Sequence, residues 1–259
     1  MIDKNKFIKN MNLIVYSGNE AFKEGAQKIK EDALQHNKKC EVVELENFST
    51  IIDKIQADCI YFLSSDKKIS EFCKILKDKN CKIINGDFLL DNLETSKYDS
   101  MGKVSCADVC IPKNFELNLY KINDCINIPM FIKAKNPRGL VKKCLDYNLI
   151  SDEIEQIPEN DRIAYYLEED VSNEDCLELK IYYVNGKVFF MDNFSGSNNI
   201  NWLHPIMNKI SKCTKLEVFS VDFLVDFKNQ KYNCIDINHA SSFFKSSIAR
   251  NEFITKILQ

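Results

Sequence analysis

The first ninety residues alternate short apolar runs with amphipathic segments, and this alternation constrains the fold more than any other feature of the sequence. The amphipathic segments 20–36 and 69–79 space their apolar residues at helical intervals. Strands that alternate with helices are typical of a parallel sheet built from βαβ units. No G-x-G-x-x-G loop follows the first run, so a dinucleotide-binding Rossmann site is not supported. The expected strands are 12–16, 40–45, 59–63 and 81–85.

The pattern changes after residue 85, where the apolar runs become strands that favour antiparallel pairing. The chain is therefore expected to have an α/β front and an α+β back. Strands are expected at 129–134, 162–171, 177–184 and 187–192, and helices near 96–105, 202–213 and 243–258.

Two apolar segments near the C-terminus, 218–225 and 232–238, are separated by a mostly polar turn and predict a β-hairpin. In an antiparallel pair the side chains of Asp222, Asp236 and Asn238 can share one face, because the last two are two residues apart. Two carboxylates and an amide carbonyl are hard ligands that suit Mg²⁺ carrying the phosphates of a nucleotide. The alternative is a hairpin with a solvated polar face.

Lys133 is the one lysine in the apolar strand 128–134. On the inner face of a strand a lysine is costly to bury unless it meets an anion such as a phosphate. The alternative is that Lys133 lies on the solvent face of an edge strand. The turn that follows, 136–139, could close its backbone amides and the side chain of Arg138 over a nucleotide.

The segment 164–171 begins apolar and ends in three consecutive acidic residues before its final valine. An adenine slot needs an apolar bed, strand backbone groups that read the ring edge, and a nearby carboxylate for the ribose hydroxyls. The alternative is an acidic loop at the end of a strand. Glu168 or Glu169 would lie at the slot, with Glu174 or Asp175 one loop further for the sugar.

The segment 177–188 alternates polar and apolar residues around Lys180 and turns at Asn185-Gly186, which is a strong signal for a hairpin. A polar loop with Ser195 and Asn198 follows.

Together and in this order, these features resemble the ATP-grasp superfamily over roughly residues 82–259. In that family a helix with a basic residue leads to an I/V-P strand, and here Lys97 precedes Pro112. The family's strand lysine on the phosphates matches Lys133, and its acidic hinge over adenine matches 166–171. Its closing metal signature, D-F/I followed by E/D-x-N, matches the two aspartates and the asparagine of the hairpin.

The resemblance implies an α/β (α+β) chain with the ATP-grasp fold. An N-terminal parallel-sheet domain would span 1–90, and an ATP-grasp domain would span 91–259, with subdomains near 91–170 and 171–259 that enclose the nucleotide. It implies Mg²⁺ and ATP as cofactors. The residues implied are Lys180, Asp222 and Asp236 for catalysis, Asp222, Asp236 and Asn238 for the metal, and Lys97, Lys133, Glu168, Glu169, Val171, Asp175, Lys180 and Ser195 for ATP.

The end of the metal signature resembles one branch of this family. Most ATP-grasp proteins are ligases with E-x-N followed by Pro-Gly, whereas this chain has an aspartate first and no Pro-Gly. The inositol 1,3,4-trisphosphate 5/6-kinase branch has D-x-N followed by P-S-Y, and a K-V-Y/F strand before an R-x-S-x-x-N loop. Lys180-Ile-Tyr and the loop 193–198 look like that strand and loop. The implied substrate-binding residues are Arg138, Asn198, His239, Ser242 and Lys245.

Two departures from that branch keep other functions open. Asn193 stands in place of the loop arginine, and Lys142, Lys143 or Cys144 fill the region of the branch's histidine. The first hypothesis is a Mg-ATP phosphotransferase acting on an inositol polyphosphate or a similar anionic small molecule. The second is an ATP-dependent carboxylate–amine or peptide ligase, and the third is a catalytically weakened nucleotide-binding protein.

Composition limits the partners and the compartment. The net charge of −3 gives no reason to expect nucleic acid or an anionic membrane as a partner. No stretch approaches the roughly 20 apolar residues that span a bilayer, and the basic, polar start does not look like a secretory signal. Eleven cysteines without a C-x-x-C pair predict reduced, buried thiols in a cytoplasmic protein. We expect a monomer or a homodimer whose partners are ATP and an anionic or carboxylate acceptor.

Overall fold

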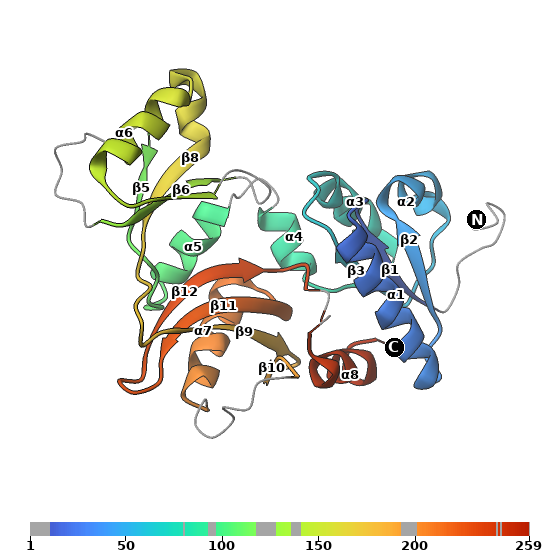
Figure 1. Cartoon of the computed structure of the whole chain (residues 1–259). Helices are drawn as coiled ribbons and strands as arrows, with labels where there is room; N and C mark the ends of the chain where they lie inside the picture. Colours follow the sequence, from blue (N-terminus) through green and yellow to red (C-terminus); the bar gives the residue numbers. More distant parts are fainter. Residues whose placement is uncertain are drawn as a thin grey trace. The chain divides into compact units, whose positions relative to one another are not determined.

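The computed structural model (Figure 1) describes residues 11–79, 81–92, 97–117, 128–135, 141–192, 201–241, 243 and 245–258, without the side chains of 92 and 97–99. The chain divides into two compact units. Unit 1 comprises Met1–Glu94, Lys180–Val221 and Asn238–Gln259, and unit 2 comprises Thr95–Leu179 and Asp222–Ile237. The domain boundaries expected near residues 90 and 170 stay a prediction. No described helix is both long enough and apolar enough to cross a membrane.

The N-terminal strands form a parallel four-stranded sheet in the order β2-β1-β3-β4, as the alternation predicted. The short helices α2 and α4 were not expected, because helices of seven residues show little periodicity in the sequence. Helix α2 begins at Leu45, so the second strand ends one residue earlier than expected. The strands are β1 (Asn12–Tyr16), β2 (Cys40–Glu44), β3 (Cys59–Leu63) and β4 (Lys82–Ile83). The helices are α1 (Glu20–Gln35), α2 (Leu45–Ile51), α3 (Lys68–Leu76) and α4 (Gly86–Asn92), with 3₁₀ turns η1 (Ile52–Lys54) and η2 (Lys77–Lys79).

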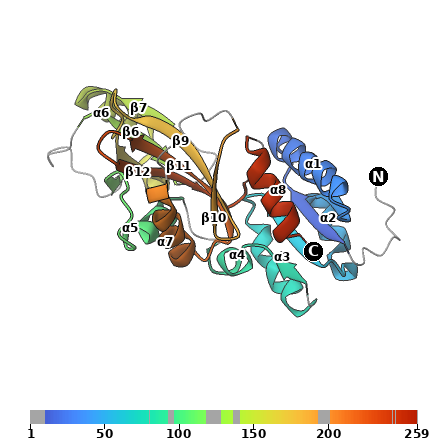
Figure 2. The ribbon, with the colours of Figure 1, turned by 90° about the horizontal axis from the view of Figure 1, so that it is seen from below.

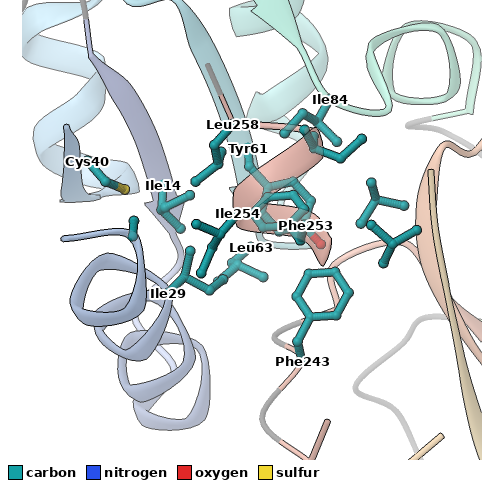
Figure 3. Packing of buried hydrophobic residues seen from close by; sticks show 14 of the residues in the cluster. Ile14, Ile29, Cys40, Tyr61, Leu63, Ile84, Phe243, Phe253, Ile254 and Leu258 are labelled. Carbon is teal, nitrogen blue, oxygen red and sulfur yellow. The ribbon is translucent and has the colours of Figure 1, made fainter. Parts of the chain in front are cut away.

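The core of unit 1 joins the parallel sheet to the C-terminal helix α8 (Ser247–Lys256). The ring of Tyr61 on β3 lies 4.9 Å from that of Phe253, and Phe253 lies 5.2 Å from Phe243 (Figure 3). Arg250 on α8 is buried, pairs with Asp32 of α1, and donates from Nη1 to the carbonyl of Phe243 at 2.9 Å. These contacts fix the chain that follows the last strand.

A second sheet has the strand order β10-β9-β11-β12. Both predicted hairpins are present. Asn185 and Gly186 have positive φ angles of 52° and 76°, as a tight turn between β9 and β10 requires. The turn between β11 and β12 is held by Asp226, whose carboxylate accepts from the backbone N–H of Asn229 at 3.0 Å. The elements are β9 (Leu177–Val184), β10 (Lys187–Phe190), η6 (Asn201–Leu203), α7 (His204–Thr214), β11 (Val218–Asp226) and β12 (Lys231–Asn238).

The third sheet belongs to unit 2 and is antiparallel, with the order β5-β8-β6-β7. Helix α6 covers one of its faces (Figures 1 and 2), where Met130, Ile132 and Leu167 pack with Ile150 and Ile154 of the helix. The elements are α5 (Lys97–Ser105), β5 (Asn114–Glu116), β6 (Met130–Ala134), β7 (Val141–Cys144), α6 (Tyr147–Gln156), η4 (Glu159–Ala164) and β8 (Tyr165–Glu169).

Candidate functional site

Lys133 and Glu168 lie on the face of the unit 2 sheet that is opposite α6. In the β6–β8 register Phe131 pairs with Glu168 and Lys133 pairs with Tyr166, so these four residues share a face. The ammonium group of Lys133 forms an ion pair with Glu168, and the two side chains are only 16% and 4% exposed. The alternative that Lys133 lies on an edge strand is wrong, because β6 lies between β8 and β7.

The same face carries two further ion pairs. Lys135 pairs with Glu116 of β5 at 3.1 Å, and Lys143 of β7 pairs with Asp170 at 2.5 Å. Partly buried ion pairs add little to stability, because desolvation offsets most of their attraction. A sheet face that nevertheless carries several of them is a candidate for binding a charged ligand.

Asp222 and Asp236 come from the paired strands β11 and β12. The alternate residues of β11, including Val221 and Phe223, are fully buried, which leaves half-buried Asp222 on the other face. On β12 the side chains of Asp236 and Asn238 alternate onto one face, as the sequence predicted, and Cys234 lies on the same face.

The buried thiol of Cys234 lies within the electrostatic reach of three carboxylates of unit 2. Burial raises the pKa of this thiol well above its ordinary value, and the charges of Asp236, Asp222 and Glu168 raise it further. Strands β12, β11 and β8 therefore bring one carboxylate each to the surroundings of the same buried side chain. This concentration of negative charge suits a cation or a substrate that carries one.

The donor set fits a magnesium ion that arrives with a substrate. Within the part of the chain that the structure describes, no three His, Cys, Asp or Glu side chains are placed to hold a metal by themselves. Mg²⁺ is commonly bound by only one or two carboxylates, and takes its remaining ligands from water and substrate phosphates. Asp222, Asp236 and the amide of Asn238 are oxygen donors of this kind, and their role as metal ligands stays a prediction.

The other residues expected to contact ATP are placed as follows. Glu168 shares the face of Lys133, whereas its strand neighbour Glu169 pairs with Met130 and points to the opposite face. Asp175 is exposed in a turn, where its backbone N–H donates to the side chain of Asn173. Val171 follows β8, half-buried Lys180 lies in the middle of β9, and Lys97 begins α5. Ser195 lies outside the described residues.

Two of the expected substrate-binding residues are described. A ring nitrogen of His239 lies 3.1 Å from the carbonyl oxygen of Ser64, which can only accept, so this nitrogen carries the proton. Its ring also lies 5.1 Å from that of Phe88. Lys245 is exposed, and its carbonyl accepts from the N–H of Asp192 at 2.9 Å. Arg138, Asn198 and Ser242 lie outside the described residues.

Asn85, which the sequence analysis did not single out, anchors the chain around the hairpin. It is buried, has a left-handed φ of 59°, and donates to the carbonyl groups of Val218 at 2.6 Å and His239 at 3.2 Å. Its side-chain oxygen accepts from the N–H groups of Glu217 and Val218. The dipeptide Asn85-Gly86 signals a turn in the sequence, but the partners of the side chain come from distant residues.

Comparison with known proteins gives one partial match by family and several by structure. A family model described as inheritance of peroxisomes protein 1 matches residues 167–259, which is less than half of the chain. No curated protein matches the sequence.

Solved structures match over nearly the whole chain. A RimK domain protein of the ATP-grasp type from Sphaerobacter thermophilus is 8% identical, with a TM-score of 0.68, over 94% of this chain and 97% of its own. The ATP-grasp ligase PsnB, solved with precursor peptide PsnA2 and AMPPNP, is 11% identical with a TM-score of 0.64, over 93% and 92%. D-alanine–D-alanine ligase from Bacillus anthracis, solved with ATP, is 14% identical with a TM-score of 0.63, over 95% and 91%. At such low identity these likenesses establish the architecture alone, and we conclude that the chain has the ATP-grasp fold.

Proposed function

We propose that this protein is a Mg-ATP-dependent ligase that activates a carboxylate and joins it to an amine. The observation that carries the proposal is the arrangement in unit 2, where Glu168, the buried ion-pair partner of Lys133, acts on the thiol of Cys234 together with Asp222 and Asp236. The structures with the same fold include a peptide-modifying ligase solved with AMPPNP and a ligase of D-alanine solved with ATP. An L-amino acid ligase from Bacillus licheniformis shares the fold as well, with a TM-score of 0.63.

The proposed roles follow from charge and position. Lys133, with Lys97 and Lys180, neutralises the phosphates of ATP, while Glu168 lies beside the base. Asp222, Asp236 and Asn238 would hold Mg²⁺, which would supply positive charge to the phosphates when bound. The adenine slot and the sugar site remain assigned to Val171 and Asp175, as in the sequence-based prediction, and Ser195 to the phosphates. Glu169 is removed from the slot, because its side chain points to the opposite face of the sheet.

The proposed reaction is a phosphoryl transfer followed by an acyl transfer. A carboxylate oxygen of the acceptor attacks the γ-phosphorus, the bond from this phosphorus to the β,γ-bridging oxygen breaks, and ADP leaves. An amine then attacks the resulting acyl phosphate, loses a proton, and expels orthophosphate as the amide bond forms. Such transfers depend mainly on positioning and on charges placed in advance around the reacting groups.

The test is ATP turnover by the purified protein with Mg²⁺ against panels of amino acids, peptides and inositol phosphates. The ligase proposal predicts ADP and orthophosphate in equal amounts, produced only when both a carboxylate and an amine are present, together with a product of the combined mass. ADP without orthophosphate would contradict it. Binding of Mg-ATP with no turnover on any panel would favour the third hypothesis, a catalytically weakened nucleotide-binding protein.

A second candidate is a kinase for an anionic small molecule such as an inositol polyphosphate. Its support is the sequence Asp236-Ile-Asn238-His239, which has an aspartate first and no following Pro-Gly. In that reaction a substrate hydroxyl takes the γ-phosphoryl group and loses its proton, with Arg138, Asn198, His239, Ser242 and Lys245 as the proposed acceptor contacts. Label from γ-labelled ATP that appears on an inositol phosphate, without free orthophosphate, would establish it.

A further inference from the structure

Two adjacent lysines on β7 point to opposite faces of the unit 2 sheet. In the β6–β7 register Lys142 pairs with Ile132, whose side chain belongs to the core under α6, and Lys143 pairs with Phe131. Accordingly, Lys142 forms its ion pair with Glu153 of α6. Lys143 therefore lies on the face of the sheet that carries Lys133 and Glu168.

The ammonium groups of Lys133 and Lys143 both lie near the ring of Phe131, at 5.3 Å and 5.7 Å from its centroid. An aromatic ring attracts cations, but two ammonium groups beside one ring repel each other unless anions balance them. In this structure Glu168 balances Lys133, and Asp170 balances Lys143. A bound polyanion could take over this role from either carboxylate.

The ion pair of Lys143 joins an exposed lysine to a buried carboxylate that has other hydrogen-bond partners. Lys143 is 43% exposed, whereas the side chain of Asp170 is only 2% exposed. The other oxygen of Asp170 accepts from the backbone N–H of Ser172 at 2.9 Å and from its hydroxyl at 2.5 Å. Burial alone would raise the pKa of Asp170, but the hydrogen bonds from Lys143 and Ser172 lower it. The carboxylate thus keeps two hydrogen bonds when the lysine moves away.

We propose that Lys143 is a further nucleotide-binding residue, which exchanges its ion pair with Asp170 for an acceptor atom of the bound nucleotide. That atom is either a phosphate oxygen or a ring nitrogen of the base, because both present a lone pair to an ammonium donor. The inference rests on the proposed function, since it requires the face of Lys133 and Glu168 to bind ATP.

The test measures the binding of Mg-AMPPNP by calorimetry to the full-length wild type, K143M and the matched control K142M. Each variant removes one lysine of similar exposure from the same strand, together with one ion pair to a carboxylate that is 13% exposed for Glu153 and 2% exposed for Asp170. We expect K143M to bind roughly tenfold more weakly, as expected for a lost hydrogen bond to a charged group, and K142M to bind like the wild type. K143R, which keeps the charge and a donor, should retain most of the affinity even if K143M folds poorly.

Each outcome separates this inference from the proposed function. If the wild type binds and K143M matches K142M, the role of Lys143 is refuted while the proposed function stands. If the wild type does not bind Mg-AMPPNP, both are refuted. Adenosine distinguishes the two acceptor atoms. If K143M loses as much affinity for adenosine as for Mg-AMPPNP, the contact is at the base. If K143M binds adenosine like the wild type, the contact is at the phosphates.

Discussion

Asp236 lies two residues after Cys234 on the same face of β12, and its charge adds to the effect of burial in raising the pKa of the Cys234 thiol. Negative charges gathered around one buried side chain repel each other unless a cation balances them. The sequence predicted the shared strand face, because alternation along a strand is a local property. It did not predict that Glu168 lies near the same thiol, since this proximity depends on how separate strands pack.

Replacing Asp236 with asparagine should abolish ATP turnover while the protein stays folded. The substitution keeps the size of the side chain and removes one of the two proposed carboxylate ligands of Mg²⁺. Turnover and the circular dichroism spectrum would be measured together, with D152N on the exposed side of α6 as the control. Intact turnover in D236N would refute the proposed metal site.

Cys234 should resist alkylation in the native protein. Only the thiolate is nucleophilic, and a raised pKa keeps the thiol of Cys234 protonated at neutral pH and above. Cys106 and Cys110 are exposed and should react first with iodoacetamide. Mass spectrometry of peptides after timed labelling checks the order, and equal labelling rates for the three cysteines would contradict the burial of Cys234.

The longer elements follow closely from sequence pattern, and the short ones do not. The strands β1, β3 and β9 have the expected bounds, because each is a run of five or more residues with strand composition. Strands β5 and β7, with three and four residues, were missed, since such short strands take their conformation from their partners in the sheet. Helix α6 was missed as well, because Ile150 and Ile154 are its only buried residues.

Two glycine-to-alanine substitutions should have opposite effects on stability. Gly186 has a φ of 76° and no atom within 4 Å of an added methyl group, so G186A adds backbone strain alone and should destabilise by about 1 kcal/mol. Gly102 lies in helix α5 with equally open space, so G102A should stabilise by about 0.5–1 kcal/mol. Urea unfolding of both variants beside the wild type measures the two effects. Shifts of the same sign would contradict the backbone argument.

At the scale of the molecule, the parallel front and the antiparallel back were predicted correctly. Both predictions follow from the order of strands and helices along the chain. The division into units was harder to predict from the sequence, because unit 1 combines the N-terminal sheet with two later segments of the chain. Core contacts such as that between Tyr61 and Phe253 create this unit, and they join residues far apart in the sequence.

Acid should destabilise the whole protein partly through Glu252 on α8. Burial raises the pKa of Glu252, but hydrogen bonds from Asn185 and Lys187 outweigh it and lower the pKa below its ordinary value. The stabilisation is therefore fully present above the pKa of the unfolded chain, about 4.3, and is lost as the pH falls through the lower folded value. Urea unfolding from pH 7 to pH 3 should show this loss, and E252Q should show a smaller one. An identical pH dependence in E252Q would contradict it.

The charges that line the unit 2 site have a consequence for the order of events in binding. Among the described side chains of unit 2, three lysines (133, 135 and 143) each pair with one carboxylate (Glu168, Glu116 and Asp170), while Asp222 and Asp236 add negative charge near Cys234. For the proposed site, a nucleotide without its metal meets repulsion, and a metal without its nucleotide finds too few ligands. Bound nucleotide therefore raises the affinity of the site for the metal, and bound metal raises its affinity for the nucleotide by the same factor. The site would then bind the magnesium complex of the nucleotide as a single ligand. The concentration of cellular magnesium would determine what fraction of the nucleotide can bind to the site.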